Sequence, residues 1–240
     1  MPGVNSPPEP DQLSLGPARM RIPNWDCFFG LGPTWHRWSS SLELLSMMKR
    51  VATADRIAEA ALRLFTVHGY AGASMEQVRR EAGVSNGSLY HHFPSRADLA
   101  ARLLVEGMGR SQQVVLNVLD DASDGEQGVR DVVHAQLGWV QEHAELAQLL
   151  YGDLPDEVLL AAEPAFGEQN RHYVDVVGGW LRAQDAHGTL VRVPFGVAHA
   201  LWLGPGQEFA RHWLRGRSKL APTEVADALA EGAWAALAMR

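Results

Sequence analysis

Residues 82–99, AGVSNGSLYHHFPSRADL, combine a glycine turn, small polar residues, a tyrosine and two adjacent histidines. Paired histidines can bind a metal, a serine beside a histidine can form a nucleophile, and small polar residues on a helix can contact DNA. His91 and His92 are neighbours, so they point about 100° apart on a helix. No third ligand follows at a spacing typical of zinc. The pattern therefore does not favour a metal site.

Ser88 and His92 are four residues apart and share a helical face. Such a pair is common, and neither an orienting acid nor an oxyanion turn accompanies it. We therefore expect no catalytic residue here, and nothing in the sequence predicts a cofactor. Two interpretations of the stretch remain open: a helix that contacts DNA, and a solvated helical hairpin inside an all-α domain.

The flanking residues predict the elements that hold this stretch. Thr53 can cap a first helix, and Gly69 stands where a left-handed C-cap is expected. Ser74 and Gln77 have the spacing of a capping box, which starts a short second helix. Gly83 ends that helix, and the tight turn after it is typical of a helix-turn-helix unit.

Ser85 can cap the third helix, whose Leu89 and Phe93 share one inward face. The outward face then carries the polar residues of the stretch. Small residues near the helix N-terminus let the backbone approach a groove floor, and asparagine and serine can hydrogen-bond to base edges. Tyrosine and histidine can reach phosphates, which position a protein without reading sequence.

The distribution of charge along the chain fits a helix that contacts DNA better than the net charge does. The net charge is −7. Residues 49–98 carry seven basic and five acidic residues, whereas residues 99–240 carry eleven basic and nineteen acidic ones. A small, mildly cationic unit thus precedes a larger acidic one. No run approaches the roughly 18 apolar residues of a membrane span, and no signal peptide is recognisable. The single cysteine, Cys27, fits a reducing cytoplasm.

The region from Ala54 to Met108 resembles the DNA-binding region of the tetracycline-repressor (TetR) family. The motif that carries the resemblance most strongly is AGVS followed by LYHHF, within residues 82–93. The sequence departs from the family pattern at Ala73, where threonine is common, and at Arg96, where lysine is commoner. The resemblance implies a homodimer that places one third helix of each subunit in the major groove of a palindromic operator.

The resemblance also implies roles for individual residues. The third-helix N-terminus, residues 86–88, would approach bases, and the basic pair at residues 49–50 would lie near the minor groove. Phosphate contacts are implied for Ser74, Tyr90, His92 and Arg96. The complete set of expected DNA-binding residues is Lys49, Arg50, Ser74, Ser85, Asn86, Gly87, Ser88, Tyr90, His91, His92 and Arg96.

Residues 1–46 differ in composition from the rest of the chain. They are rich in proline, glycine and small polar residues near the start, and aromatic but aperiodic later. We expect a disordered extension. Two alternatives stay open: a tail that packs Trp25, Phe28 and Trp35 on the main body, and an over-extended reading frame whose natural start is Met47 or Met48.

Residues 99–240 predict a helical ligand-binding and dimerisation domain after a DNA-binding domain at residues 47–98. A helix capped by Ser95 should link the two, and Pro155 and Pro164 should break the region between later helices. Gly204–Gly206 should kink a helix near the C-terminus. The fold expected is all-α with about nine helices, which agrees with the family's architecture.

Aromatic residues of this domain could line an apolar cavity with a few polar anchors. Their helical spacing is equally typical of core. The candidate ligand-binding residues are His134, Gln136, Trp139, Tyr151, Phe166, Phe195 and Trp202. The last helices also carry large apolar residues that suit either a four-helix dimer interface or packing within the monomer. These are Trp202, Trp213, Leu229, Trp234 and Leu237.

The function expected is a cytoplasmic, ligand-responsive DNA-binding regulator, a repressor by the family's usual mode. The effector is a small molecule that the sequence does not identify. The alternative is a helical small-molecule-binding protein without operator-specific DNA binding. An enzyme lacks a supporting constellation of acid, base and nucleophile.

Overall fold

The computed structural model describes residues 41–239, with side chains from residue 47 onward. Within this range the regular elements are all helical, and a single antiparallel bridge pairs Leu190 with Ala238. The elements are α1 Ser41–Gly72, α2 Met75–Ala82, α3 Asn86–His92, α4 Arg96–Asp121, α5 Gly125–Glu142, α6 Ala144–Leu150, α7 Asp156–Ala186, α8 Phe195–Trp202, α9 Gly204–Leu214, the 3₁₀-helix η2 Pro222–Val225 and α10 Ala226–Leu237. The expected all-α fold is confirmed, with ten α-helices in the described range instead of about nine.

Side-chain caps start the helices that surround the glycine turn. Ser74 accepts the Gln77 amide while the Gln77 side chain accepts the Ser74 amide, which completes the predicted capping box of α2. Ser85 accepts the Ser88 amide at 3.1 Å to start α3. Ser95 accepts the Asp98 amide at 3.1 Å to start α4, as its position predicted. Caps of this kind depend on residues three apart, so the sequence alone locates them.

Three predicted boundaries are wrong. Thr53 lies inside α1, and its hydroxyl donates to the Lys49 carbonyl instead of capping a helix. Pro164 lies inside α7, on the exposed side of the helix, where water can satisfy the carbonyl that loses its amide partner. The Gly204–Gly206 segment does not kink one helix but forms the first turn of α9, after a break from α8 at Leu203, and its proline stands where no amide donor is needed.

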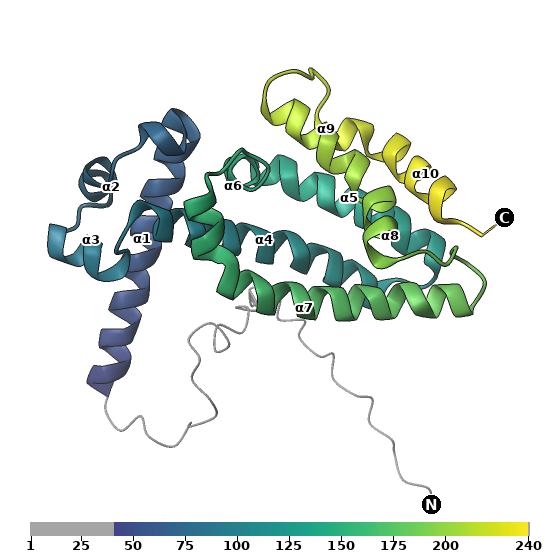
Figure 1. Ribbon diagram of the computed structural model, residues 1–240, viewed down its shortest axis with the longest axis horizontal. Helices are drawn as coiled ribbons and strands as arrows, with labels where there is room; N and C mark the ends of the chain where they lie inside the picture. The colour runs from purple at the N-terminus through teal and green to yellow at the C-terminus, as the bar shows by residue number, and fades with distance from the viewer. Residues whose placement is uncertain (1–40, 240) are drawn as a thin grey trace, which may run out of the picture. The chain divides into compact units, whose positions relative to one another are not determined.

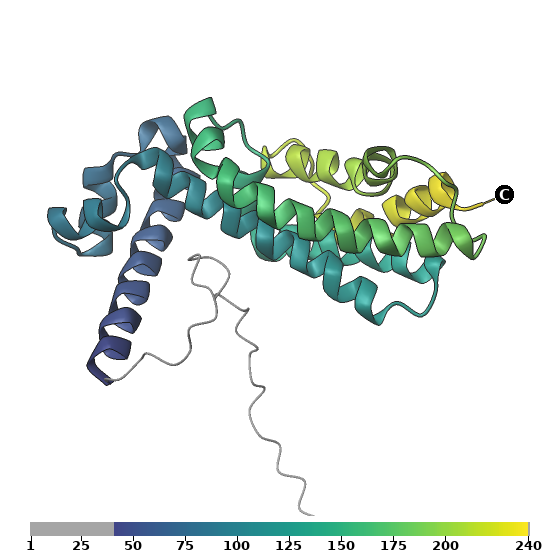
Figure 2. The same ribbon diagram turned by 60° about the horizontal axis from the view of Figure 1, so that its bottom comes forward.

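Three apolar clusters hold the described residues together. The first packs α1, α2 and α3 onto the beginning of α4 and includes Val158 and Ala162 of α7, so the helix-turn-helix unit shares its core with the rest of the chain. The second lies among α4, α5, α7, α8 and α10, and the third among α5, α6 and α9. Figures 1 and 2 both show α4 and α7 side by side, with α2 and α3 beyond the start of α4.

The large apolar residues near the C-terminus pack within the monomer. Trp202 and Leu237 are buried in the second cluster, and Leu229 and Trp234 pack against it. Trp213 packs against the third cluster. Trp202 and Leu237 are therefore core residues of the monomer, whereas Trp213, Leu229 and Trp234 stay partly exposed and their place in a dimer interface stays a prediction.

The expectations for Trp25, Phe28 and Trp35 concern residues outside the described range. The boundary expected after residue 46 falls within α1, which already begins at Ser41. The division into domains at residues 46 and 98 stays a prediction.

Candidate nucleic-acid interface and junction cleft

The α3 helix presents one polar face to solvent because its apolar face is buried in the first cluster. Leu89 is 0% exposed and Phe93 is 6% exposed, so both anchor the helix in the first cluster. On the opposite side, Asn86, Gly87 and His91 are exposed, and the Tyr90 ring keeps 47% of its surface in solvent. The predicted outward face is thus accessible, although its contact with DNA stays a prediction.

The turn before α3 is fixed by backbone hydrogen bonds. Gly83 has a φ of 62°, a conformation that favours glycine, and its amide donates to the carbonyls at the end of α2. The Val84 side chain is buried, and the Arg79 guanidinium donates to the Val84 carbonyl at 3.2 Å. This arrangement fixes the direction in which α3 leaves α2.

Two serines of the predicted DNA-binding set serve as helix caps. The Ser85 and Ser74 hydroxyl oxygens accept amides at the starts of α3 and α2. Ser74 also donates its hydroxyl to the Gln77 side chain at 2.9 Å. Their structural role is therefore evident, and any phosphate contact must be made in addition to the cap.

Arg96 is engaged in a local network that sequence reasoning missed. Its guanidinium donates to the carbonyls of Ala71 and Ala73, at 3.3 and 3.0 Å, and lies 4.2 Å from the centroid of the Tyr70 ring. The Tyr70 hydroxyl in turn donates to Glu157 of α7. Arg96 thus holds the segment between α1 and α2. The separation of 25 residues from Ala71 explains why local spacing gave no signal for this contact.

The imidazoles of α3 lie near the basic start of the described chain. The rings of His91 and His92 are 5.5 Å apart and approach edge to face. Burial, the neighbouring His91 and the charge of Arg50 together lower the pKa of His92 below 6.5. The Arg50 charge on α1 therefore acts on α3. Lys49 and Arg50 are both exposed.

The α2 helix contributes less positive charge than its sequence suggests. Arg79 and Arg80 both pair with Glu76, at 2.7 Å each. Hydrogen bonds from Arg79 and Arg80 lower the pKa of Glu76 to about 2. The carboxylate thus stays ionised at neutral pH and partly neutralises α2.

The described residues form neither a candidate metal site nor a membrane-spanning helix. No group of three or more histidine, cysteine or acidic side chains there could hold a metal ion. Among the same residues, no helix is both long enough and apolar enough to span a membrane.

The seven predicted ligand-binding residues do not surround one cavity. Trp139 and Trp202 are 6% and 2% exposed and belong to different clusters, and the Trp202 indole donates to the Val129 carbonyl. His134 is exposed and pairs with Asp227 at 3.3 Å. Phe166 packs against the first cluster. Helical spacing alone did not separate core aromatics from cavity walls.

The remaining predicted residues lie at separate places. Gln136 is buried and donates to the hydroxyls of Ser111 and Tyr151, at 2.7 and 3.3 Å. Phe195 lines a recess of about 360 Å³ between α7, α8 and the segment before α8. Tyr151 lines a larger recess, of about 450 Å³, where α1, α6 and α9 meet. We call this larger recess the junction cleft.

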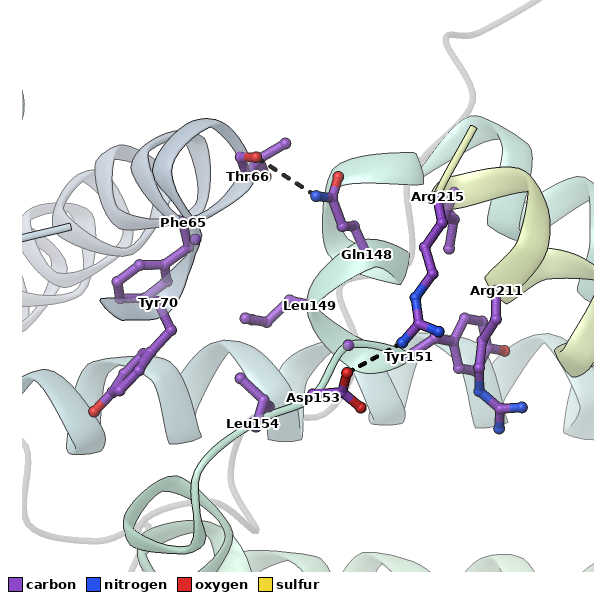
Figure 3. Close-up of a pocket in the computed structure, with 13 residues that line it drawn as sticks. Phe65, Thr66, Tyr70, Gln148, Leu149, Tyr151, Asp153, Leu154, Arg211 and Arg215 are labelled. Atoms are coloured by element: carbon purple, nitrogen blue, oxygen red, sulfur yellow. Dashed lines mark hydrogen bonds and ion pairs between the residues drawn. The ribbon is translucent and has the colours of Figure 1, made fainter. Parts of the chain in front are cut away.

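The junction cleft has two chemically different ends (Figure 3). Phe65 and Tyr70 of α1 lie at one end, near Leu149 and Leu154. Arg211 of α9 and Arg215, which directly follows α9, lie at the other end, where Arg215 donates to Asp153 at 3.2 Å. Sequence analysis missed these arginines. Their spacing of four on one helical face was the available signal, but it did not indicate what they face.

The chain was compared with known proteins. Residues 57–103 match the family described as bacterial regulatory proteins, tetR family. That segment spans the end of α1, all of α2 and α3, and the start of α4. These residues form a helix-turn-helix segment of the TetR family.

One curated relative of the chain is the HTH-type transcriptional regulator LmrA of Bacillus subtilis. The two are 29% identical over 111 residues, which cover 46% of the chain and 59% of LmrA. The chain thus aligns with less than two thirds of that relative.

Two solved structures show the same fold. FadR from Bacillus subtilis in complex with stearoyl-CoA has a TM-score of 0.64 at 18% identity, with 75% of this chain and 97% of FadR covered. AibR in complex with isovaleryl coenzyme A and operator DNA has a TM-score of 0.58 at 18% identity, with 74% and 96% covered. These likenesses show that the helical bundle shares the fold of the two proteins.

Proposed function

We propose that this chain is a transcriptional regulator that binds double-stranded DNA through α3. The observation that carries the proposal is the exposed polar face of α3, which follows a rigid glycine turn inside the segment that matches the TetR family. Residues 86–88 approach bases, and Tyr90, His92 and Ser74 contact phosphates. Lys49 and Arg50 add charge beside the groove.

The chain acts as a homodimer on a palindromic operator. Because Trp202 and Leu237 are buried within the monomer, the dimer face uses other side chains. Val197 and Leu201 of α8 are 45% and 39% exposed, and α10, which packs beside α8, presents small residues outward. Helices with such faces can pack closely against a second copy.

The dimer face is testable with one substitution and its control. Leu201→Glu should shift the sedimentation coefficient to that of a monomer, whereas Val174→Glu, at an exposed valine of α7, should leave the dimer unchanged. The opposite pattern would move the interface to α7.

The regulator responds to a small molecule and represses transcription by occupying its operator. The complexes of FadR with stearoyl-CoA and of AibR with isovaleryl coenzyme A support ligand binding in this fold. We infer that the chain works in the cytoplasm by binding and not by catalysis. The alternative is a ligand-binding protein without operator-specific binding. It is supported by the net charge of −7 and by the ion pairs that neutralise the arginines of α2.

A gel-shift titration of the full chain decides between these functions. The DNA is the region upstream of the chain's own gene, with a shuffled duplex of equal length as control. Binding to the upstream duplex at least about tenfold tighter than to the shuffled one supports the regulator. Equal binding to both supports the alternative.

A further inference from the structure

The junction cleft has walls from both the helix that supports α2 and α3 and the helices of the bundle. Phe65, Thr66 and Tyr70 belong to the helix that supports α2 and α3, whereas Arg211 belongs to α9 and Arg215 directly follows it. Its volume of about 450 Å³ lies within the range of small-molecule sites, roughly 300–1,000 Å³. The cleft therefore has the size for a ligand that touches both parts.

The two ends of the cleft fit the two ends of an amphipathic anion. Phe65 is 4% exposed, and with Leu149, 8% exposed, it makes a fixed apolar wall. At the opposite end the guanidiniums of Arg211 and Arg215 come from α9 and the residue that directly follows it, and such groups bind carboxylates through charge-assisted hydrogen bonds.

The two arginines at the cationic end of the cleft can exchange their present ion-pair partners for a ligand. The Asp153 side chain that pairs with Arg215 is 98% exposed, and ion pairs in solvent contribute little stability. Arg211 pairs with Glu208 on its own helix and lies 6.0 Å from the Tyr151 ring, with 37% of its side chain exposed. A ligand carboxylate can therefore replace Asp153 without leaving a buried charge unpaired.

We propose that the junction cleft binds an organic carboxylate, with its anion on Arg211 and Arg215 and its apolar body against Phe65, Leu149 and Leu154. This assignment rests on the proposed function, because it identifies the effector site of the regulator and the chemical class of the effector. The seven residues expected from sequence shared no such cavity, whereas these residues come from three helices and one loop.

Occupation of the cleft acts on the DNA-binding unit through Tyr70. Tyr70 lines the cleft, and the Arg96 guanidinium lies over the Tyr70 ring. The same guanidinium donates to the carbonyls of Ala71 and Ala73, just before α2. Gln148 of α6 also donates to the Thr66 carbonyl of α1 at 3.5 Å. A ligand bound between α1 and α9 changes these contacts. The ligand and DNA must therefore change each other's binding affinity by the same factor.

The test is calorimetric titration of the full chain, without DNA, using octanoate and its neutral counterpart octanol. Octanoate should bind at least about fivefold tighter than octanol, because only the carboxylate can use the two guanidiniums. Equal affinity for the two probes, or no binding of either, would overturn the proposal.

Three variants locate the binding. Arg215→Gln should weaken octanoate about five- to tenfold, whereas Asp153→Asn should tighten it about two- to fivefold by releasing Arg215. Arg217→Gln is the matched control, since this exposed arginine lies two residues further on and outside the cleft lining. Octanoate binding that all three variants leave unchanged would place the anion elsewhere and overturn the assignment. Because no DNA is present, a failed gel shift would contradict the proposed function and leave this result standing.

Discussion

The α2–α3 unit and the bundle of α4–α10 are held by interactions of very different range along the chain. Ser74 with Gln77 and Ser85 with Ser88 are pairs three residues apart. In the bundle, Trp202 bonds to a carbonyl 73 residues away, and Gln112 to a side chain 58 residues away. The first kind of interaction can be recognised in a sequence, whereas the second needs the packed structure.

The largest effect should come from removing a long-range anchor of the bundle. Trp202→Ala should lower the free energy of unfolding by about 3–5 kcal/mol, because it empties a buried site and leaves the Val129 carbonyl without its donor. Urea titration followed by circular dichroism measures the change. Leu160→Ala, at a position of α7 that is 67% exposed, should change stability by less than about 0.5 kcal/mol. Equal losses in both variants would mean that Trp202 is not the anchor described.

In the α2–α3 unit, substitutions on the outward face should affect DNA binding and leave stability unchanged. Asn86→Ala should relax the base preference at one operator position and cost about 1–3 kcal/mol there. Tyr90→Phe should instead weaken binding to all sequences alike. Binding profiles on a randomised duplex library, with thermal melts as the folding control, separate the two. An unchanged profile for Asn86→Ala would remove it from the base-reading set.

Substitutions of two glycines in α4 test how closely this helix packs against neighbouring side chains. A methyl group at Gly107 would lie 3.0 Å from the Leu146 side chain in the core, so Gly107→Ala should destabilise the chain by about 1 kcal/mol. At Gly109 it would meet the flexible Gln169 amide, so Gly109→Ala should stabilise by about 0.5 kcal/mol through helix propensity. Melting temperatures of the two variants should move in opposite directions. A shift of the same sign in both would show that the Leu146 contact does not decide the outcome.

The smallest effect should be a pH dependence of DNA binding. The lowered pKa of His92 keeps it mostly neutral in the free chain at pH 7, whereas a nearby phosphate favours the protonated form. Binding therefore takes up a proton, and affinity should rise a few-fold as the pH falls through about 6.5. The free chain loses stability over the same interval, because protonation is disfavoured when folded. Fluorescence anisotropy from about pH 7.5 to 5.5 should show a smaller rise for His92→Gln than for His91→Gln.

The sequence predicted the features that depend on local interactions and missed those that depend on contacts between distant residues. The capping serines, the glycine turn and the outward face of α3 could be placed because each depends on residues a few positions apart. The helical class followed from periodicity, but Pro164 was misinterpreted because its exposure depends on how α7 packs. The junction cleft was not predicted because Tyr70, Tyr151 and Arg215 meet only after α1, α6 and α9 pack together. The contacts of Arg96 with the carbonyls of Ala71 and Ala73 were not predicted because they join residues more than 20 positions apart in sequence.

The central claim is that the exposed face of α3 reads DNA in a dimer. The most direct test is selection of bound duplexes from a random-sequence pool by the full chain. We expect enrichment of an inverted repeat whose half-sites lie about 34–36 Å apart, or a multiple of that spacing, with the preferred bases lost in Asn86→Ala. A pool that stays random after selection, or an enriched site that Asn86→Ala and Tyr90→Phe both leave unchanged, would contradict the claim.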